Sequence, residues 1–143
     1  MTAHGVAERL GGKRVLERDV QTDFDLVDAI EEGLPIAAAE AVIRAGTLSA
    51  SEIHDLVIPR RTLAHRKDKG QRLTAEQSDR LTRVVRVAAR AEEAIGDADK
   101  AARWLRKPNR ALQGKRPLEL LESDLGARLV EQVLGRIEHG LVA

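Results

Sequence analysis

Apolar side chains recur along this chain at intervals of three and four residues, which is the spacing of one face of an α-helix. Runs of this kind start at Phe24, Ala38, Leu81 and Leu125. Glycine and proline separate the runs, and none of them alternates in the way a half-buried strand does. The hydrophobic pattern therefore predicts an all-α protein.

Capping signals indicate where the predicted helices start. Ser49 is followed three residues later by Glu52, and Thr74 by Gln77, and each pair has the spacing of a capping box. Glycines and prolines indicate where helices stop, because glycine adopts left-handed backbone and proline cannot continue a helix. The helices predicted in this way cover approximately residues 24–33, 35–45, 49–57, 59–67, 74–95, 97–105, 117–121 and 123–139.

The apolar faces of these helices predict the core. We expect Phe24 and Val27 to be buried in the first helix, and Leu125 and Leu129 in the last. Aliphatic and alanine side chains must supply most of the packing, since the chain has one Phe, one Trp and no Tyr. Residues 1–21 show no clear period, so we expect a flexible segment or a short helix there.

Charge is distributed unevenly along the chain, although the formal net charge is only +1. Residues 1–58 hold 5 Lys/Arg against 11 Asp/Glu, a net charge of −6. Residues 59–72 hold 6 Lys/Arg against 1 Asp, a net charge of +5 in a short segment. Such a concentration of positive charge is typical of a surface that binds phosphate groups.

The two short helices predicted over residues 49–69 have the proportions of a helix-turn-helix. The second has only Leu63 and Ala64 as apolar residues, so most of its surface must face solvent. Arginine can pair with guanine, threonine can meet a base edge, and lysine can hold a phosphate. A solvated helix without a ligand is the alternative interpretation. The candidate DNA-binding residues are Arg60, Arg61, Thr62, His65, Arg66, Lys67 and Lys69.

Arginines form a second feature, along the long central helix. Arg83, Arg86 and Arg90 are spaced three and four residues apart, so they form one stripe. The stripe is either a solvated face, paired in part with Asp79 and Glu93, or a docking surface for an acidic partner or for DNA phosphate.

The sequence offers little for catalysis or for metal binding. There is no cysteine, which excludes disulfides, thiolate ligands and cysteine nucleophiles. The four histidines lie far apart in the sequence, so no two of them stand at ligand spacing. The loop over residues 107–117 lacks the glycine spacing of a nucleotide-binding loop. We therefore expect a binding protein rather than an enzyme, with no cofactor and no metal.

The sequence also bears on the compartment. No apolar run approaches the roughly 20 residues that span a bilayer. Charges interrupt the N-terminal segment where a signal peptide has its apolar stretch. We expect a cytoplasmic protein with no membrane partner.

A series of motifs runs from about residue 34 to the end of the chain. They begin with Arg61-Thr62-Leu63-Ala64-His65-Arg66, Leu73-Thr74 and Ser78-Asp79-Arg80-Leu81. They continue with Ala101 to Leu105, Pro108-Asn109, Ala111-Leu112, Gly114, Pro117-Leu118, Leu120-Leu121, Gly126, Val130, Leu134 and Arg136-Ile137-Glu138-His139-Gly140. In this order, these motifs resemble the Xre/ParS/MbcA-type antitoxins, which are partners of RES-domain toxins.

The resemblance implies an architecture and a function. It implies an N-terminal helix-turn-helix region and a C-terminal helical toxin-binding domain whose end lies close to the active-site cleft of the toxin. It also implies a homodimer that represses its own operon on double-stranded operator DNA and neutralises a toxin that degrades NAD. By the same resemblance, the toxin-binding domain contains Trp104, Asn109, Leu112, Gly114, Pro117, Arg136, Ile137, Glu138 and Gly140.

This chain departs from the family pattern at three places. Gln77 stands where an acidic residue is common, and Gln113 stands where glycine is common. The last three residues, 141–143, lack the aromatic side chain that many relatives carry. Contacts made by the turn at Gln113 and by the tail can therefore differ from those of the family.

These observations predict three parts: a flexible N-terminal segment at 1–21, a helix-turn-helix region at 22–70 and a toxin-binding domain at 71–143. The function that they favour is an antitoxin of a type II toxin–antitoxin system, occluding the active site of a RES-type toxin. The alternative is a stand-alone helix-turn-helix transcriptional regulator without a toxin partner.

Overall fold

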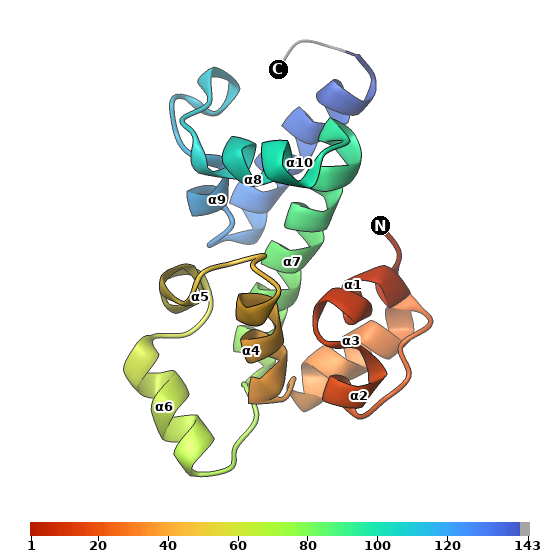
Figure 1. Ribbon diagram of the computed structural model, residues 1–143, viewed down its shortest axis with the longest axis vertical. Coiled ribbons are helices and arrows are strands. Elements are labelled where there is room, and N and C mark those ends of the chain that lie inside the picture. The colour runs from red at the N-terminus through yellow and green to blue at the C-terminus, as the bar shows by residue number, and fades with distance from the viewer. Residues whose placement is uncertain (141–143) are drawn as a thin grey trace. The chain divides into compact units, whose positions relative to one another are not determined.

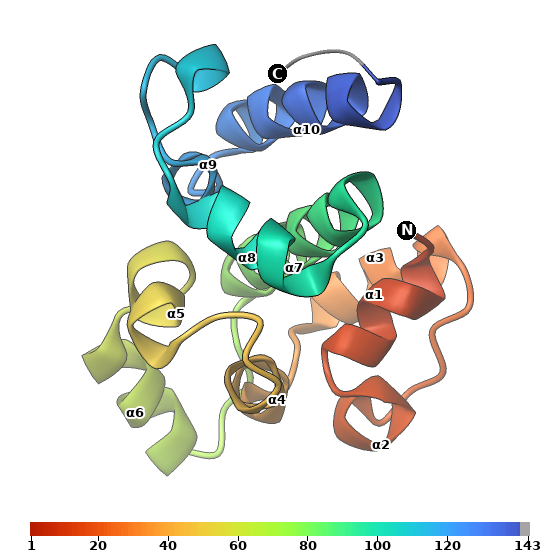
Figure 2. The same cartoon turned by 45° about the horizontal axis from the view of Figure 1, so that its top comes forward.

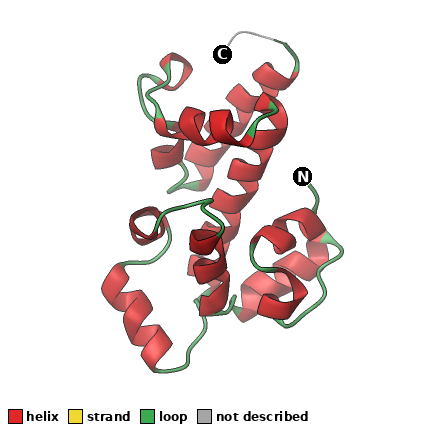
Figure 3. Ribbon diagram, in the orientation of Figure 1, coloured by secondary structure: helices red, strands yellow, loops and turns green. Residues whose placement is uncertain are grey.

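The computed structural model describes residues 1–140 and is all-helical over that range, as the hydrophobic pattern predicts (Figures 1 and 3). Among these residues the only β-type pairing is an isolated antiparallel bridge between Asn109 and Lys115. The first helices are α1 (Ala3–Arg9), α2 (Gly12–Leu16), α3 (Asp23–Glu32), α4 (Ile36–Arg44), α5 (Ala50–Leu56) and α6 (Arg60–Asp68). They are followed by α7 (Ala75–Ile95), α8 (Ala98–Arg106), the 3-10 helix η1 (Arg110–Leu112), α9 (Pro117–Leu120) and α10 (Asp124–Glu138).

The chain divides into two compact units. One comprises residues 2–85, and the other comprises residues 86–143 together with Met1. The long helix α7 therefore contributes its first half to one unit and its second half to the other. The predicted boundary between residues 70 and 71 lies in the turn before α7, whereas the compact units meet inside that helix.

Residues 1–21, for which a flexible segment or a short helix was expected, are largely helical. They form α1 and α2, and Figure 1 shows these helices in red beside α3. Burial explains the order, because Val6, Leu10, Leu16 and Val20 are each at most 3% exposed. Val6 and Leu10 lie four residues apart, as do Leu16 and Val20, but Gly11 and Gly12 separate the two pairs, so no long helical period indicated them as core.

A tight backbone contact attaches the start of α7 to the turn between α3 and α4. The backbone N–H of Leu34 donates to the Ser78 hydroxyl (2.8 Å), and the Leu34 carbonyl accepts from the N–H of Leu73 (2.9 Å). Gly33 allows this approach: its φ is +96°, and a Cβ there would overlap the Leu73 carbonyl oxygen. The contact explains why the first half of α7 belongs to the same unit as α4.

Both predicted capping boxes are present. The hydroxyl of Ser49 accepts from the Glu52 N–H (3.1 Å), and the Glu52 carboxylate accepts from the Ser49 N–H (2.9 Å). Thr74 and Gln77 make the same reciprocal pair at 3.1 and 2.9 Å, so the glutamine caps α7 as well as an acidic residue can.

The second unit packs α8, α9 and α10 with the end of α7. Helix α9 contacts both α8 and α10, and Figure 2 shows it at the turn between them. Val130, Val133 and Leu134 on α10 are buried. Gly126 is also buried, and a Cβ at this position would overlap the carbonyl oxygen of Leu120. A glycine is therefore required where α10 crosses the end of α9.

Two predicted apolar faces are not buried. Phe24 is 83% exposed and Val27 is 48% exposed on α3, and Leu125 is 68% exposed and Leu129 is 43% exposed on α10. In each of these two helices, the apolar stripe is wider than the part of the helix against which neighbouring elements pack. The core takes Ala29 from α3, and Val130, Val133 and Leu134 from the predicted inner face of α10. The apolar pattern thus identified both helices and part of the buried face of α10, but it made the buried faces too wide.

Candidate functional site

Helix α6 presents a basic, solvent-exposed face. It follows α5 after a short turn, with Val57, Ile58 and Pro59 between them, and Pro59 is its N-cap. None of its side chains is fully buried. Six of the seven candidate residues are exposed, and five of these six have no side-chain partner within residues 1–140. These five are Arg60, Arg61, Thr62, His65 and Lys69.

The other two candidates hold α6 in place. The guanidinium Nε of Arg66 donates to the carbonyl oxygen of Arg72 (2.6 Å), in the turn that leads to α7. The ammonium of Lys67 donates to the carboxylate of Glu40 on α4 (2.6 Å), and this hydrogen bond raises the pKa of Lys67. The candidate set thus divides into five exposed side chains without a partner in the described residues and two cations, Arg66 and Lys67, that bind other parts of the chain.

Arg72 extends the attachment of α6 to the rest of its unit. Its guanidinium donates to the Gly33 carbonyl (3.2 Å) and lies 3.6 Å from the Glu17 carboxylate. Because Arg66 binds the Arg72 backbone, a chain of polar contacts links α6 to the α3–α4 turn. In the sequence, Arg72 is only one of the cations of the basic segment. No spacing rule predicts that it links α6 to the α3–α4 turn.

The loop after α8 is built by Asn109. Its side-chain Oδ1 accepts from the Ala111 N–H (2.9 Å), and its backbone N–H donates to the Lys115 carbonyl (3.0 Å). Leu112 is 6% exposed and anchors the loop. Gln113 adopts a left-handed conformation with φ +56°, followed by Gly114 at φ +80°.

The remaining residues of the predicted toxin-binding set fall into two groups. Pro117 is buried at the start of α9. The Glu138 carboxylate accepts from the Arg90 guanidinium (3.2 Å), so both residues are engaged within the chain. Trp104 on α8 is half-buried, as is Ile137, while Arg136 is exposed with no partner within residues 1–140. Gly140 has φ +75° and follows the end of α10. The tail, residues 141–143, lies outside the described residues.

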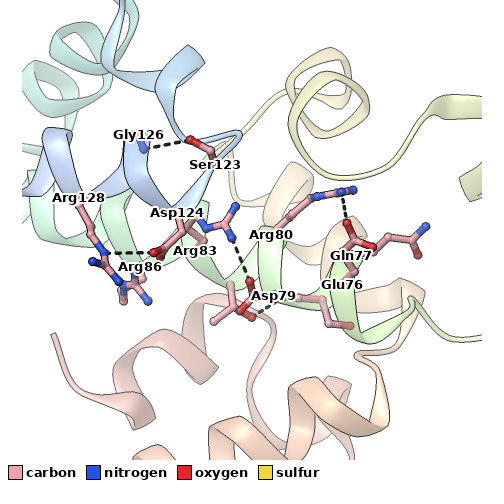
Figure 4. A network of polar contacts seen from close by, with 12 residues as sticks. Glu76, Gln77, Asp79, Arg80, Arg83, Arg86, Ser123, Asp124, Gly126 and Arg128 are labelled. Atoms are coloured by element: carbon pink, nitrogen blue, oxygen red, sulfur yellow. Dashed lines mark hydrogen bonds and ion pairs between the residues drawn. The ribbon is translucent and has the colours of Figure 1, made fainter. Parts of the chain in front are cut away.

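The arginine stripe on α7 is mostly neutralised inside the protein. Figure 4 shows Arg80 beside Glu76 and Arg83 beside Asp79, each pair one turn apart, and the second pair is 3.0 Å apart. Arg86 lies 3.0 Å from Glu131 of α10. These ion pairs favour the solvated, internally paired interpretation of the stripe over a docking surface, and most of the pairing carboxylates differ from the ones expected.

Two further features are absent from the described residues. No group of three or more His, Asp or Glu side chains among residues 1–140 is placed to hold a metal ion. Within the same range, no helix has both the length and the apolar character needed to cross a bilayer.

Comparison with known proteins assigns both halves of the chain. Residues 25–86 match the model of the antitoxin Xre-like helix-turn-helix domain, and residues 90–140 match that of the antitoxin Xre/MbcA/ParS C-terminal toxin-binding domain. An antitoxin Xre of Pseudomonas putida is 35% identical over 85% of this chain and 76% of its own length. One from Photorhabdus laumondii is 34% identical over 80% of this chain and 78% of its own.

The chain belongs to the Xre antitoxin family. The resemblance inferred from the motifs is confirmed, and so is the fold of a helix-turn-helix domain followed by a helical toxin-binding domain. In this family member, α3 to α6 and most of α7 lie in the helix-turn-helix domain. The end of α7 and α8 to α10 lie in the toxin-binding domain.

Proposed function

We propose that this chain neutralises a RES-type, NAD-degrading toxin by covering the entrance to its active site. The family membership and the toxin-binding domain at residues 90–140 support a toxin as the partner. Steric occlusion suits a chain with no cysteine and no cluster of metal ligands within residues 1–140, because a docked protein surface excludes NAD without catalysis.

The predicted toxin-binding residues divide by role in this proposal. Asn109, Leu112 and Pro117 shape the loop and α9, since each is buried or bonded within the chain. Trp104 and Arg136 touch the toxin, since one is half-exposed and the other is exposed without a partner in the described range. Of the remaining members, Gly114 sets the backbone of the loop after α8. Ile137, Glu138 and Gly140 form the end of α10 and the residue that follows it.

The DNA half of the proposal rests on α6. Its exposed Arg60, Arg61, Thr62, His65 and Lys69 would contact bases and phosphates when the helix enters the major groove. Arg66 and Lys67 are placed to add phosphate contacts if their present partners release them. A homodimer would set two such helices about 34 Å apart on successive turns of an operator.

Co-expression with the protein encoded by the neighbouring gene tests the toxin half. The complex is purified by a tag on that partner, and NAD consumption is measured with and without this chain. A stable complex in which NAD loss stops is the expected result. A partner that consumes NAD equally fast in the presence of this chain would refute the antitoxin assignment.

Binding to the DNA upstream of its own gene tests the other half. Titration at fixed salt, against a scrambled fragment of equal length, is expected to show a specific complex with two chains bound. Specific DNA binding by this chain, together with a neighbouring gene product that neither binds it nor consumes NAD, would favour the stand-alone regulator. Equal affinity for the scrambled fragment would contradict operator repression.

A further inference from the structure

The outer face of α10 carries the largest apolar exposure in the toxin-binding domain. Leu125 is 68% exposed and Leu129 is 43% exposed, and no other large apolar side chain among residues 90–140 is as open to solvent. A single exposed leucine is ordinary on a protein surface, but two on adjacent turns of one helix form a continuous apolar strip.

Polar residues extend this apolar strip along the same face of α10. Leu125, Leu129, Gln132 and Arg136 follow at intervals of four, three and four residues, so they share one face of α10. Gln132 and Arg136 are exposed as well. The face thus presents, in order, two leucines, an amide and a guanidinium; we call these four residues the α10 strip.

The charge on this face is not compensated by the helix itself. All three carboxylates of α10 are already in ion pairs: Asp124 with Arg128 at 3.1 Å, Glu131 with Arg86 at 3.0 Å, and Glu138 with Arg90 at 3.2 Å. Figure 4 shows the first of these pairs. Arg136 is left as the cation of the strip without a partner among residues 1–140.

We propose that the α10 strip is the surface that docks the toxin, an inference that rests on the toxin-neutralising function proposed above. The site that fits it on the partner is an apolar depression for the two leucines with a carboxylate where Arg136 arrives. Such a carboxylate satisfies the guanidinium, and burial of the leucines supplies the non-directional attraction.

A second copy of this chain fits the strip less well. Two α10 helices packed side by side in parallel would bring Arg136 against Arg136, and like charges in a desolvated contact oppose association. In antiparallel packing Arg136 meets the start of the other helix, where Asp124 is already paired with Arg128. The toxin is therefore the occupant that fits the strip better, and the strip lies within residues 90–140, which match the toxin-binding domain.

The test compares full-length variants that remove the strip without removing the helix. Leu125→Gln with Leu129→Gln keeps residues that favour helix, so α10 is expected to form as before. Titrated against the toxin that co-purifies with the unaltered chain, this variant is expected to bind on the order of 100-fold more weakly, because two anchoring side chains are lost. Arg136→Gln is expected to weaken binding about tenfold.

Matched controls come from elsewhere in the chain. Phe24→Gln with Val27→Gln removes a comparable exposed apolar pair from α3, outside residues 90–140, and is expected to leave toxin affinity within about threefold. Arg44→Gln removes an exposed arginine outside residues 90–140, and is expected to do the same. Far-ultraviolet circular dichroism checks that each variant keeps its helices.

The outcomes separate the two proposals. If the unaltered chain does not bind the toxin, the proposed function fails and this inference fails with it. If the unaltered chain binds and the Leu125→Gln/Leu129→Gln variant binds equally well, only the α10 strip is wrong. Sedimentation that shows self-association lost in that variant, with toxin affinity unchanged, would assign the strip to a second copy and overturn the inference.

Discussion

At the scale of single residues, backbone conformation explains choices that composition leaves open. Gln113 occupies a left-handed conformation (φ +56°), which glycine adopts more readily than other residues. A side chain in that conformation is strained by about 1–2 kcal/mol, because its Cβ crowds the following carbonyl. The turn nevertheless forms, since Asn109 and Lys115 tie its two ends together.

Gln113→Gly is expected to raise the free energy of unfolding by about 0.5–1 kcal/mol, because relief of strain exceeds the entropy cost of glycine. Urea denaturation measures the change. Gly114→Ala is the control with the opposite sign: φ is +80° and nothing lies near the added methyl, so strain alone should destabilise it. Equal stability of all three proteins would show that the turn relaxes.

Asp97, the N-cap of α8, predicts that the stability of the protein depends on pH. The Lys100 N–H donates to the Asp97 carboxylate (2.8 Å) and holds the pKa of Asp97 below its ordinary value. Its ionised form is thus favoured by folding, and that stabilisation is complete above the unfolded pKa of about 3.9. It is lost as the pH falls through the lower folded pKa.

Asp97→Asn keeps a capping side chain but removes the charge. The stability difference between the two proteins is expected to be constant above about pH 5 and to shrink below about pH 4, where Asp97 protonates. Denaturant titrations at several pH values follow it. A difference that does not change between pH 3 and pH 6 would contradict the assignment.

At the scale of elements, the two glycines of α10 differ in whether the surrounding structure leaves room for a side chain. Gly126 is required because the Leu120 carbonyl occupies the space of its Cβ, whereas Gly135 meets only the end of the Arg90 side chain at 3.6 Å. Glycine in a helix interior otherwise costs stability relative to alanine. Sequence alone cannot distinguish the two positions, because both lie in the same helical pattern.

Gly126→Ala is expected to destabilise the chain by about 2 kcal/mol or more, since α10 must move away from the end of α9. Gly135→Ala, its partner experiment in the same helix, is expected to stabilise the chain by about 0.5–1 kcal/mol. Thermal and urea denaturation report both. If both variants were destabilised equally, the close approach of α9 and α10 would be in error.

Helix α6 is held by polar contacts rather than by burial, which suits an element whose surface is used for binding. Arg61→Gln is expected to lower operator affinity about tenfold without changing stability, because Arg61 has no internal partner in the described range. Arg66→Gln is expected to lower both affinity and, by about 0.5–1 kcal/mol, stability, because it also loses the hydrogen bond to the Arg72 carbonyl. Operator titration and urea denaturation of each variant separate the two effects; equal stability losses would contradict the division.

At the scale of the whole molecule, the two compact units suggest that the two binding functions are separable. Arg60→Gln with Arg61→Gln is expected to reduce the slope of log affinity for DNA against log salt by about 2, since two phosphate-range cations are removed. The same protein should inhibit the toxin as well as the unaltered chain does. Loss of toxin inhibition in this folded variant would show that the two functions are coupled.

Much of this protein could be predicted from local sequence. Caps, prolines and the 3.6-residue period placed the helices close to their observed bounds: the segment predicted at 59–67, for example, is α6 at Arg60–Asp68. Local signals suffice here because a helix satisfies its own backbone hydrogen bonds. The basic character of α6 and the family motifs of the second half are also properties of the sequence alone.

Only the tertiary structure decided which faces turn inward and which cations remain free. Phe24 and Leu125 belong to good apolar stripes yet stay exposed, whereas Val6 and Leu10 in an irregular segment are buried. Burial depends on what packs against a residue, and a helical period specifies a face without specifying its neighbour. Likewise, Lys67 differs from Lys69 because Glu40, 27 positions earlier, reaches only one of them.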